Sequence, residues 1–264
     1  MHITIRGSGP PLVLITGLQG RWEYMGDAVA ALSRSFRVIT FALAGERASG
    51  LRLDPALGLD NYVSQVLRAL DETGTARAAI CGISFGGVVA VRFAAAYPDR
   101  VSSLILASAP GPLWRLKARH RIYARAPWLF GPFFIAEASR RIRDELAVTM
   151  PVRSARVRFA IKQVVTFLRA PVSIGGMARR ARIISTLDLA DDCRRITAPT
   201  LVLTGEPGLD HVVPVEGTSQ YVCLIAGARR AVLEHTGHAG STTRPDAFAA
   251  IVCEFVETQH HAAA

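Results

Sequence analysis

The stretch "CGISFGG", residues 81–87, decides how the rest of the chain is interpreted. In it, Ser84 stands between Gly82 and Gly86, where the strand-like run "AAIC" gives way to the helix-like run "VVAVRFAAAY". A turn that presents a serine hydroxyl between a strand and a helix brings neighbouring backbone close, so it needs small residues on both sides of the serine. The stretch therefore predicts a nucleophile elbow at Ser84. The alternative is a glycine-rich turn with an idle serine.

Short runs rich in Val, Ile and Leu alternate with helical patterns on both sides of this turn. The predicted strands cover residues 2–6, 12–16, 37–41, 78–81, 103–107, 200–204 and 231–234, and the predicted helices cover residues 25–35, 59–73, 87–97 and 246–258. Most of these strands are too continuously apolar for a sheet that is exposed on one face. The alternation predicts an α/β fold with a doubly wound, mostly parallel sheet.

The alternation stops between residues 112 and 185, where the sequence becomes helical, aromatic and rich in arginine. Neither junction of this segment is rich in Gly and Ser, so an insertion into the main domain is favoured over a separate domain on a flexible linker. We therefore predict a core of residues 1–111 and 186–259, a helical cap inserted at residues 112–185, and a disordered tail at residues 260–264.

The formal net charge of +10 is concentrated in the inserted segment. Residues 111–185 contain 16 Lys+Arg against three Asp+Glu, whereas acidic residues are in slight excess elsewhere. Three explanations stay open: a solvated basic face, attraction of an anionic substrate or an acidic carrier protein, and contact with an anionic lipid surface. No recognised nucleic-acid-binding module accompanies the charge, so we expect no nucleic acid partner.

The composition indicates a folded domain, since half of the 264 residues are hydrophobic and 20% are charged. No apolar run reaches the roughly 18 residues that a transmembrane helix needs, and the first residues lack the pattern of a signal peptide. The four cysteines are scattered, without the spacing of a metal or redox site, which favours buried thiols in a reducing compartment. We expect a cytoplasmic location, no transmembrane segment, no metal and no cofactor.

The chain resembles the α/β-hydrolase family, and its serine esterases in particular, over nearly its whole length. The resemblance lies in "GISFGG", "YPDRVSSLILASAP", "LVLTGEPGLDHVVP" and "TGHAGSTTRPDAFAAIVCEFV", which follow the order and spacing of the family. It implies the α/β-hydrolase fold, a serine–acid–histidine triad in that chain order, and a helical cap at the arginine-rich segment.

Carried over residue by residue, the resemblance implies a triad of Ser84, Asp210 and His238. Asp210 follows the strand "TLVLTG" and begins "DHVVP", although a longer connection than usual leaves Glu206 as a minor alternative acid. His238 lies in "HTGHAG", where the family has its histidine. The nearby His235 lacks the preceding glycine and is expected to be structural.

The resemblance also implies an oxyanion hole formed by the backbone N–H groups of Leu18, in "TGLQG", and Phe85. Two turns depart from the family pattern. Thr16 and Gly17 stand where the family often has His-Gly, and Ala42 stands where a carboxylate normally pins the following loop. These departures concern the geometry of the loops more than the nucleophile.

We expect a cofactor-independent serine hydrolase of the carboxylesterase type, acting on small to medium acyl esters. The substrate-binding candidates are Trp22, Trp128 and Phe133, which could line an apolar acyl or alcohol pocket; packing in the core is the alternative. A thioesterase, a lactonase or a C–C bond hydrolase could use the same triad. A ligand-binding protein with a slow or vestigial triad also stays open.

Overall fold

The computed structural model describes residues 1–263, apart from the side chains of residues 132, 134, 135, 138, 139 and 260–263. Its strands form one sheet in the order β1-β3-β2-β4-β5-β6-β7. The strands are β1 (Ile3–Arg6), β2 (Pro11–Ile15), β3 (Arg37–Phe41), β4 (Ala78–Ile83), β5 (Val101–Ala107), β6 (Thr200–Thr204) and β7 (Arg229–Val232). Only β1 pairs antiparallel among these strands, so the predicted mostly parallel sheet is confirmed.

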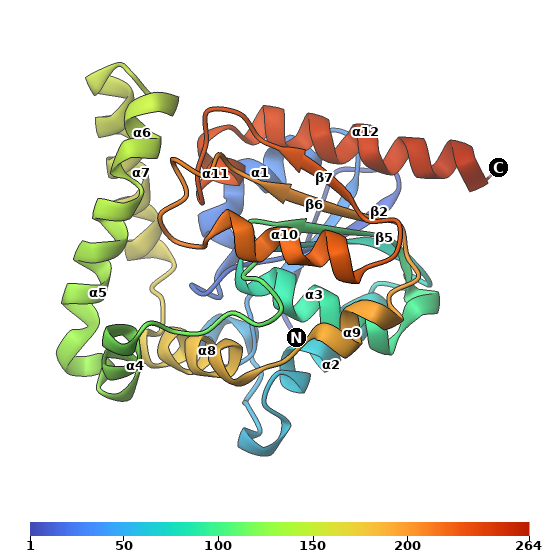
Figure 1. The fold of residues 1–264 in the computed structure, drawn as a ribbon, viewed down its shortest axis with the longest axis horizontal. Helices are drawn as coiled ribbons and strands as arrows, with labels where there is room; N and C mark the ends of the chain where they lie inside the picture. The colour runs from blue at the N-terminus through green and yellow to red at the C-terminus, as the bar shows by residue number, and fades with distance from the viewer. Residues whose placement is uncertain (264) are drawn as a thin grey trace.

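Helices cover both faces of the sheet (Figure 1). One face is covered by α2 (Asp60–Glu72), α3 (Phe85–Ala96), α9 (Ala190–Arg195) and α10 (Val215–Leu224), and the other by α1 (Gly26–Leu32) and α12 (Pro245–Ala263) with the short α11 (Gly240–Thr243). The 3-10 turns are η1 (Trp22–Met25), η2 (Arg47–Ser49), η3 (Pro55–Leu57) and η4 (Pro98–Arg100). The sheet is therefore doubly wound, as predicted. Within the described residues, no helix is long and apolar enough to span a bilayer.

The segment between β5 and β6 contains α4 (Ala118–Arg125), α5 (Pro127–Arg141), α6 (Arg143–Thr149), α7 (Arg153–Arg169) and α8 (Ile174–Thr186), which we call the helical insertion. In Figure 1, α5, α6 and α7 stand at the left edge, beyond the end of the sheet where β6 terminates. In parallel sheets with helices on both faces, sites gather at the carboxyl ends of the strands. The insertion thus lies over the edge where a site is expected.

The structure differs from the sequence predictions at the carboxyl-terminal end of the chain. Helix α12 continues to Ala263, through most of the residues predicted as a disordered tail. Neither Gly nor Pro follows Pro245, and the final residues include alanines, which have the highest helix propensity. Ala264 lies outside the described residues.

Candidate active site

Ser84 occupies a strained turn between β4 and α3. β4 ends at Ile83 and α3 begins at Phe85, and Ser84 has φ 53° and ψ −118°. A backbone conformation of this kind costs a non-glycine residue about 1–3 kcal/mol. A Cβ on Gly86 would lie 2.1 Å from the carbonyl oxygen of Ile15, and a Cβ on Gly82 would lie 2.3 Å from that of Gly86. Gly86 therefore lets the turn pack against β2, and Gly82 lets β4 and the start of α3 approach each other.

The structure brings Ser84, His238 and Asp210 together. His238 Nε2 lies 3.2 Å from Ser84 Oγ, and His238 Nδ1 lies 3.4 Å from Asp210 Oδ2. Glu206, the minor alternative, accepts a hydrogen bond from the backbone N–H of His235 at 2.7 Å. The His235 side chain is mostly exposed, and its Nδ1 lies 3.9 Å from Glu206 Oε1. Asp210, rather than Glu206, is thus the carboxylate that faces His238.

The carboxylate of Asp210 is buried and is held in its ionised form. Its Oδ1 accepts the backbone N–H groups of Val212 and Val213 at 3.0 and 2.9 Å. Burial alone would raise the pKa of Asp210, but His238 and these two hydrogen bonds outweigh burial, and the pKa lies below its ordinary value. An ionised carboxylate at this place can fix the tautomer of His238 and stabilise its cationic form.

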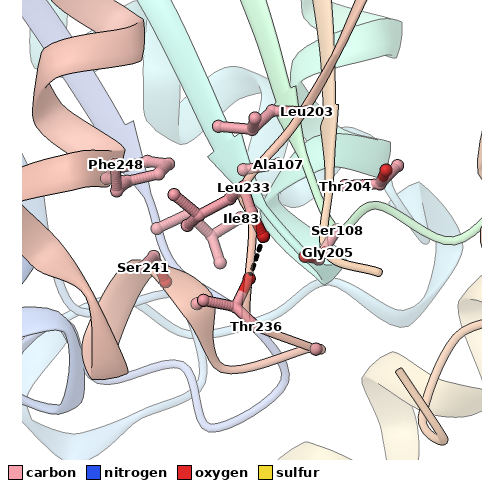
Figure 2. Close-up of a pocket in the computed structure, with 12 residues that line it drawn as sticks. Ile83, Ala107, Ser108, Leu203, Thr204, Gly205, Leu233, Thr236, Ser241 and Phe248 are labelled. Carbon is pink, nitrogen blue, oxygen red and sulfur yellow. Dashed lines mark hydrogen bonds between the residues drawn. The ribbon is translucent and has the colours of Figure 1, made fainter. Parts of the chain in front are cut away.

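The loops that carry Asp210 and His238 pack backbone against backbone. A Cβ on Gly237 would lie 2.3 Å from the carbonyl oxygen of Leu209, so a larger residue before His238 would push the loops apart. Gly237 also lines a small cavity, which Figure 2 shows together with the hydrogen bond that Thr236 Oγ1 donates to the carbonyl of Leu233 at 2.7 Å. The cavity in that view has a volume of about 10 Å³. Such a space holds at most about one water molecule, so it belongs to the packing of the site rather than to a substrate pocket.

The two predicted oxyanion donors belong to segments that lie beside Ser84. Phe85 is the first residue of α3, so its N–H has no acceptor within that helix. A Cβ on Gly17 would lie 3.4 Å from the Cβ of Ser84, which puts the loop containing Leu18 directly beside the nucleophile candidate. The segments that carry the two donors thus meet at Ser84, and the donor roles of Leu18 and Phe85 stay predictions.

A buried ion pair that the sequence did not predict supports the Leu18 loop. Arg180 of α8 is fully buried and donates from Nε to the carbonyl oxygen of Leu18 at 2.8 Å and from Nη2 to Glu46 Oε1 at 2.6 Å. Glu46 Oε2 accepts the backbone N–H of Ser173 at 3.1 Å. Glu46 follows β3 in the same turn as Ala42, which stands where the family normally has a carboxylate. A neighbouring carboxylate thus joins that turn to the insertion and to the Leu18 loop.

A buried carboxylate of the insertion, Glu145 of α6, contacts the histidine loop. It is 0% exposed, and it accepts the N–H of Ala239, which follows His238, at 2.9 Å and the hydroxyl of Thr243 at 3.0 Å. Burial raises the pKa of Glu145, although these hydrogen bonds and His238 partly oppose the rise. No signal in the sequence marked Glu145, because a carboxylate in an arginine-rich segment is ordinarily solvated.

Asp144, the residue before Glu145 on α6, lies near the loop that carries Asp210. Asp144 Oδ2 lies 3.4 Å from Nε2 of His211, the residue after Asp210, and both side chains are exposed. One short helix of the insertion therefore touches the loop of the acid and the loop of the histidine.

The three substrate-binding candidates lie in different surroundings. Trp22 is half-buried and packs against the core cluster beneath α1 and α12, which agrees with the alternative of packing in the core. Trp128 and Phe133 of α5 are 82% and 63% exposed. Their role in substrate binding stays a prediction. Within the described part of the chain, no cluster of three or more His, Cys, Asp or Glu side chains could hold a metal ion.

Several basic residues of the insertion line a groove of about 690 Å³ beside Asp210 and His211. Glu137 lies in it and pairs with Arg119 at 2.5 Å and with Arg141 at 2.6 Å. The groove is open at the surface and is large enough for a small organic molecule. Its cationic lining consists of Arg115, Lys117, Arg119, Arg140 and Arg141.

The fold corresponds to a known family. The family model of the alpha/beta hydrolase fold matches residues 10–245, and the chain belongs to this family. The predicted fold class is thereby confirmed, and membership of this family identifies the chain as a hydrolase.

Several relatives extend over almost the whole chain. A putative carbamate hydrolase RutD of Pseudomonas savastanoi pv. phaseolicola is 26% identical, with 98% of each chain covered. A pimeloyl-[acyl-carrier protein] methyl ester esterase of Nitrosomonas europaea is also 26% identical, over 94% of this chain and 96% of the relative. Among solved structures, an enol-lactonase from Burkholderia xenovorans LB400 is 25% identical with a TM-score of 0.77, covering 97% of this chain and 96% of that one.

Proposed function

We propose that the chain is a serine hydrolase of the carboxylesterase type that cleaves small to medium acyl esters through an acyl-enzyme. The observation that carries the proposal is the row of Ser84 Oγ, the imidazole of His238 and the buried carboxylate of Asp210, with successive separations of 3.2 and 3.4 Å. Serine is a weak nucleophile near neutral pH, and a base within hydrogen-bond reach is what activates it.

In the proposed mechanism, Nε2 of His238 accepts the proton of Ser84 Oγ while Oγ bonds to the ester carbonyl carbon. The N–H groups of Leu18 and Phe85 bind the resulting oxyanion. His238 then returns the proton to the leaving alcohol oxygen as the carbon–oxygen bond breaks. Water attacks the acyl-enzyme with His238 again as the base, and the acid product and free Ser84 are released. Asp210 stabilises the cationic imidazole during both steps.

Arg180 and Glu145 act as positioning residues in this proposal, because neither touches a reacting atom. Arg180 holds the carbonyl of Leu18, and Glu145 holds the N–H of Ala239. Both residues belong to the helical insertion, whereas the groups they hold belong to the loops of the site. The insertion therefore helps to align the oxyanion donors and the base.

The test compares the wild type with Ser84→Ala on 4-nitrophenyl butyrate. The expected loss in kcat is about 10⁴- to 10⁶-fold, since removing the nucleophile of a triad has an effect of this size. A serine-directed fluorophosphonate should label the wild type and leave Ser84→Ala unlabelled. The matched control is Ser35→Ala, at an exposed serine, which should retain both activity and labelling. Equal activity in the wild type and Ser84→Ala would refute the proposal, and an unlabelled wild type would favour a ligand-binding scaffold.

An acyl–nitrogen bond is the second candidate for the bond that is cleaved. It is favoured by the relatives named carbamate hydrolase and by a pyrrolizixenacetamide deacetylase of Xenorhabdus hominickii, which is 27% identical over 96% of this chain. The same triad serves if His238 protonates a leaving nitrogen instead of an oxygen. Values of kcat/KM for an ester, a carbamate, a thioester, a lactone and a β-diketone of similar size separate these activities. Preference for the carbamate would replace the ester assignment and keep Ser84.

A further inference from the structure

Helix α7 presents an apolar stripe to solvent. Its 17 residues include none that is buried. Val157, Ile161, Val164 and Leu168 follow one another at spacings of four, three and four residues, which puts them on one side of the helix. Their exposed fractions are 50%, 58%, 59% and 73%.

The opposite side of α7 faces the protein and mixes polar with apolar residues. Phe159, Gln163 and Thr166 lie on that side and are half-buried. Just beyond the helix, the hydroxyl of Tyr24 in η1 donates to the carbonyl of Ala170 at 3.2 Å. A surface helix ordinarily turns its apolar side toward the core, so α7 has the reverse orientation. A continuous apolar stripe left outside is typical of an interaction surface.

Cations flank the stripe. Arg153 lies one turn before Val157, Arg158 lies three residues before Ile161, and Arg169 follows directly after Leu168. All three arginines are exposed, and the whole sequence from residue 146 to residue 187 contains neither Asp nor Glu. The outer surface of α7 is thus apolar along its middle and positive at its margins.

We propose that α7 docks on an anionic lipid surface, lying in the plane of the interface with its apolar stripe among the lipid chains. Basic residues beside an apolar helix face suit this location, because the cations meet anionic head groups while the apolar side chains leave water. At about 1.5 Å per residue, the helix offers a contact roughly 25 Å long. The charge disfavours a second copy of the chain as the occupant, because pairing two such helices would bring cations together. The proposal is independent of the catalytic assignment.

The test is sedimentation of the full chain with vesicles of phosphatidylcholine alone or with 30% phosphatidylglycerol. Three variants are compared with the wild type: a triple variant with Val157→Ser, Ile161→Ser and Leu168→Ser, a double variant with Arg158→Gln and Arg169→Gln, and the control Leu57→Ser. Leu57 lies on η3 and is 48% exposed, comparable to Val157. Melting temperatures verify that each variant is folded, and light scattering gives the oligomeric state.

We expect binding to the anionic vesicles that weakens as salt is added, and weak binding to phosphatidylcholine alone. The double charge variant should bind roughly 25-fold more weakly, about fivefold for each cation removed. The triple variant should bind at least about tenfold more weakly, while Leu57→Ser binds as the wild type does. Absence of binding, or equal binding by the wild type and the triple variant, would overturn the proposal. A stable dimer that the triple variant dissolves would also overturn it, by making a second copy the occupant.

Discussion

Replacing Arg180 by methionine tests whether the buried ion pair joins the insertion to the site. Arg180 and Glu46 are 0% and 3% exposed, so Arg180→Met keeps most of the packing but leaves the carboxylate of Glu46 buried without its cation. Removing one partner of a buried ion pair costs about 3–5 kcal/mol. The whole free energy of unfolding of a domain is about 5–15 kcal/mol, so the loss is a large fraction of it.

Urea unfolding followed by circular dichroism measures this loss, and a double-mutant cycle apportions it. Arg180→Met combined with Glu46→Gln should be less destabilised than the sum of the two single variants, because no charge is then left unpaired. The neighbouring, exposed Arg179 provides the matched control, and Arg179→Met should change stability by less than about 0.5 kcal/mol.

The same variants test the link to the site. Arg180→Met removes the donor to the carbonyl of Leu18, so kcat for 4-nitrophenyl butyrate should fall under conditions where the variant is folded, with a smaller change in KM. Arg179→Met should retain kcat. The reasoning is refuted if Arg180→Met unfolds at the same urea concentration as Arg179→Met and keeps the wild-type kcat.

Three further predictions concern the site. Glu145→Ala removes the acceptor of the partly buried N–H of Ala239, which should cost about 1–3 kcal/mol in urea unfolding and lower kcat, with partial recovery in Glu145→Gln. An unchanged kcat in both variants would remove the positioning role. Gly86→Ala puts a Cβ 2.1 Å from a carbonyl oxygen of β2 and should abolish esterase activity. The control Gly26→Ala has open space around the added Cβ and should retain activity. An active Gly86→Ala would contradict the described elbow. Because the pKa of Asp210 is lowered by folding, its carboxylate contributes stability above its ordinary pKa of about 3.9, and this contribution is lost as the pH falls through the folded-state pKa. Acid titration followed by circular dichroism should therefore show a shallower loss of stability for Asp210→Asn than for the wild type, and equal slopes would count against the assigned pKa direction.

The features that the sequence predicted well are those that depend on local pattern. β3 and β6 begin and end at the predicted residues, because continuous β-branched and apolar runs give a strong local signal. The turn at Ser84 was predictable because glycine spacing, strand and helix all occur within a few residues. α10 was missed, since its sequence "VEGTSQYVCL" mixes glycine, threonine and serine with the apolar residues and has weak helical character.

The features that were missed depend on contacts between distant segments. Arg180 and Glu46 are 134 residues apart, and Glu145 and Ala239 are 94 apart. Nothing in the sequence near any of these residues shows that its charge or N–H will be paired away from water. Periodicity alone shows that α7 has an apolar side, but it does not show whether that side faces the core or solvent.

The contact of Glu145 with Ala239 matters for engineering substrate selectivity. One way to change selectivity is to replace the insertion with that of a relative. A transplanted segment that lacked an acceptor at this place would leave the backbone after His238 without its anchor, and the chimera would lose turnover before any difference in selectivity could be seen. Transplants that retain a carboxylate there, and a guanidinium in place of Arg180, are the ones in which new selectivity can be measured.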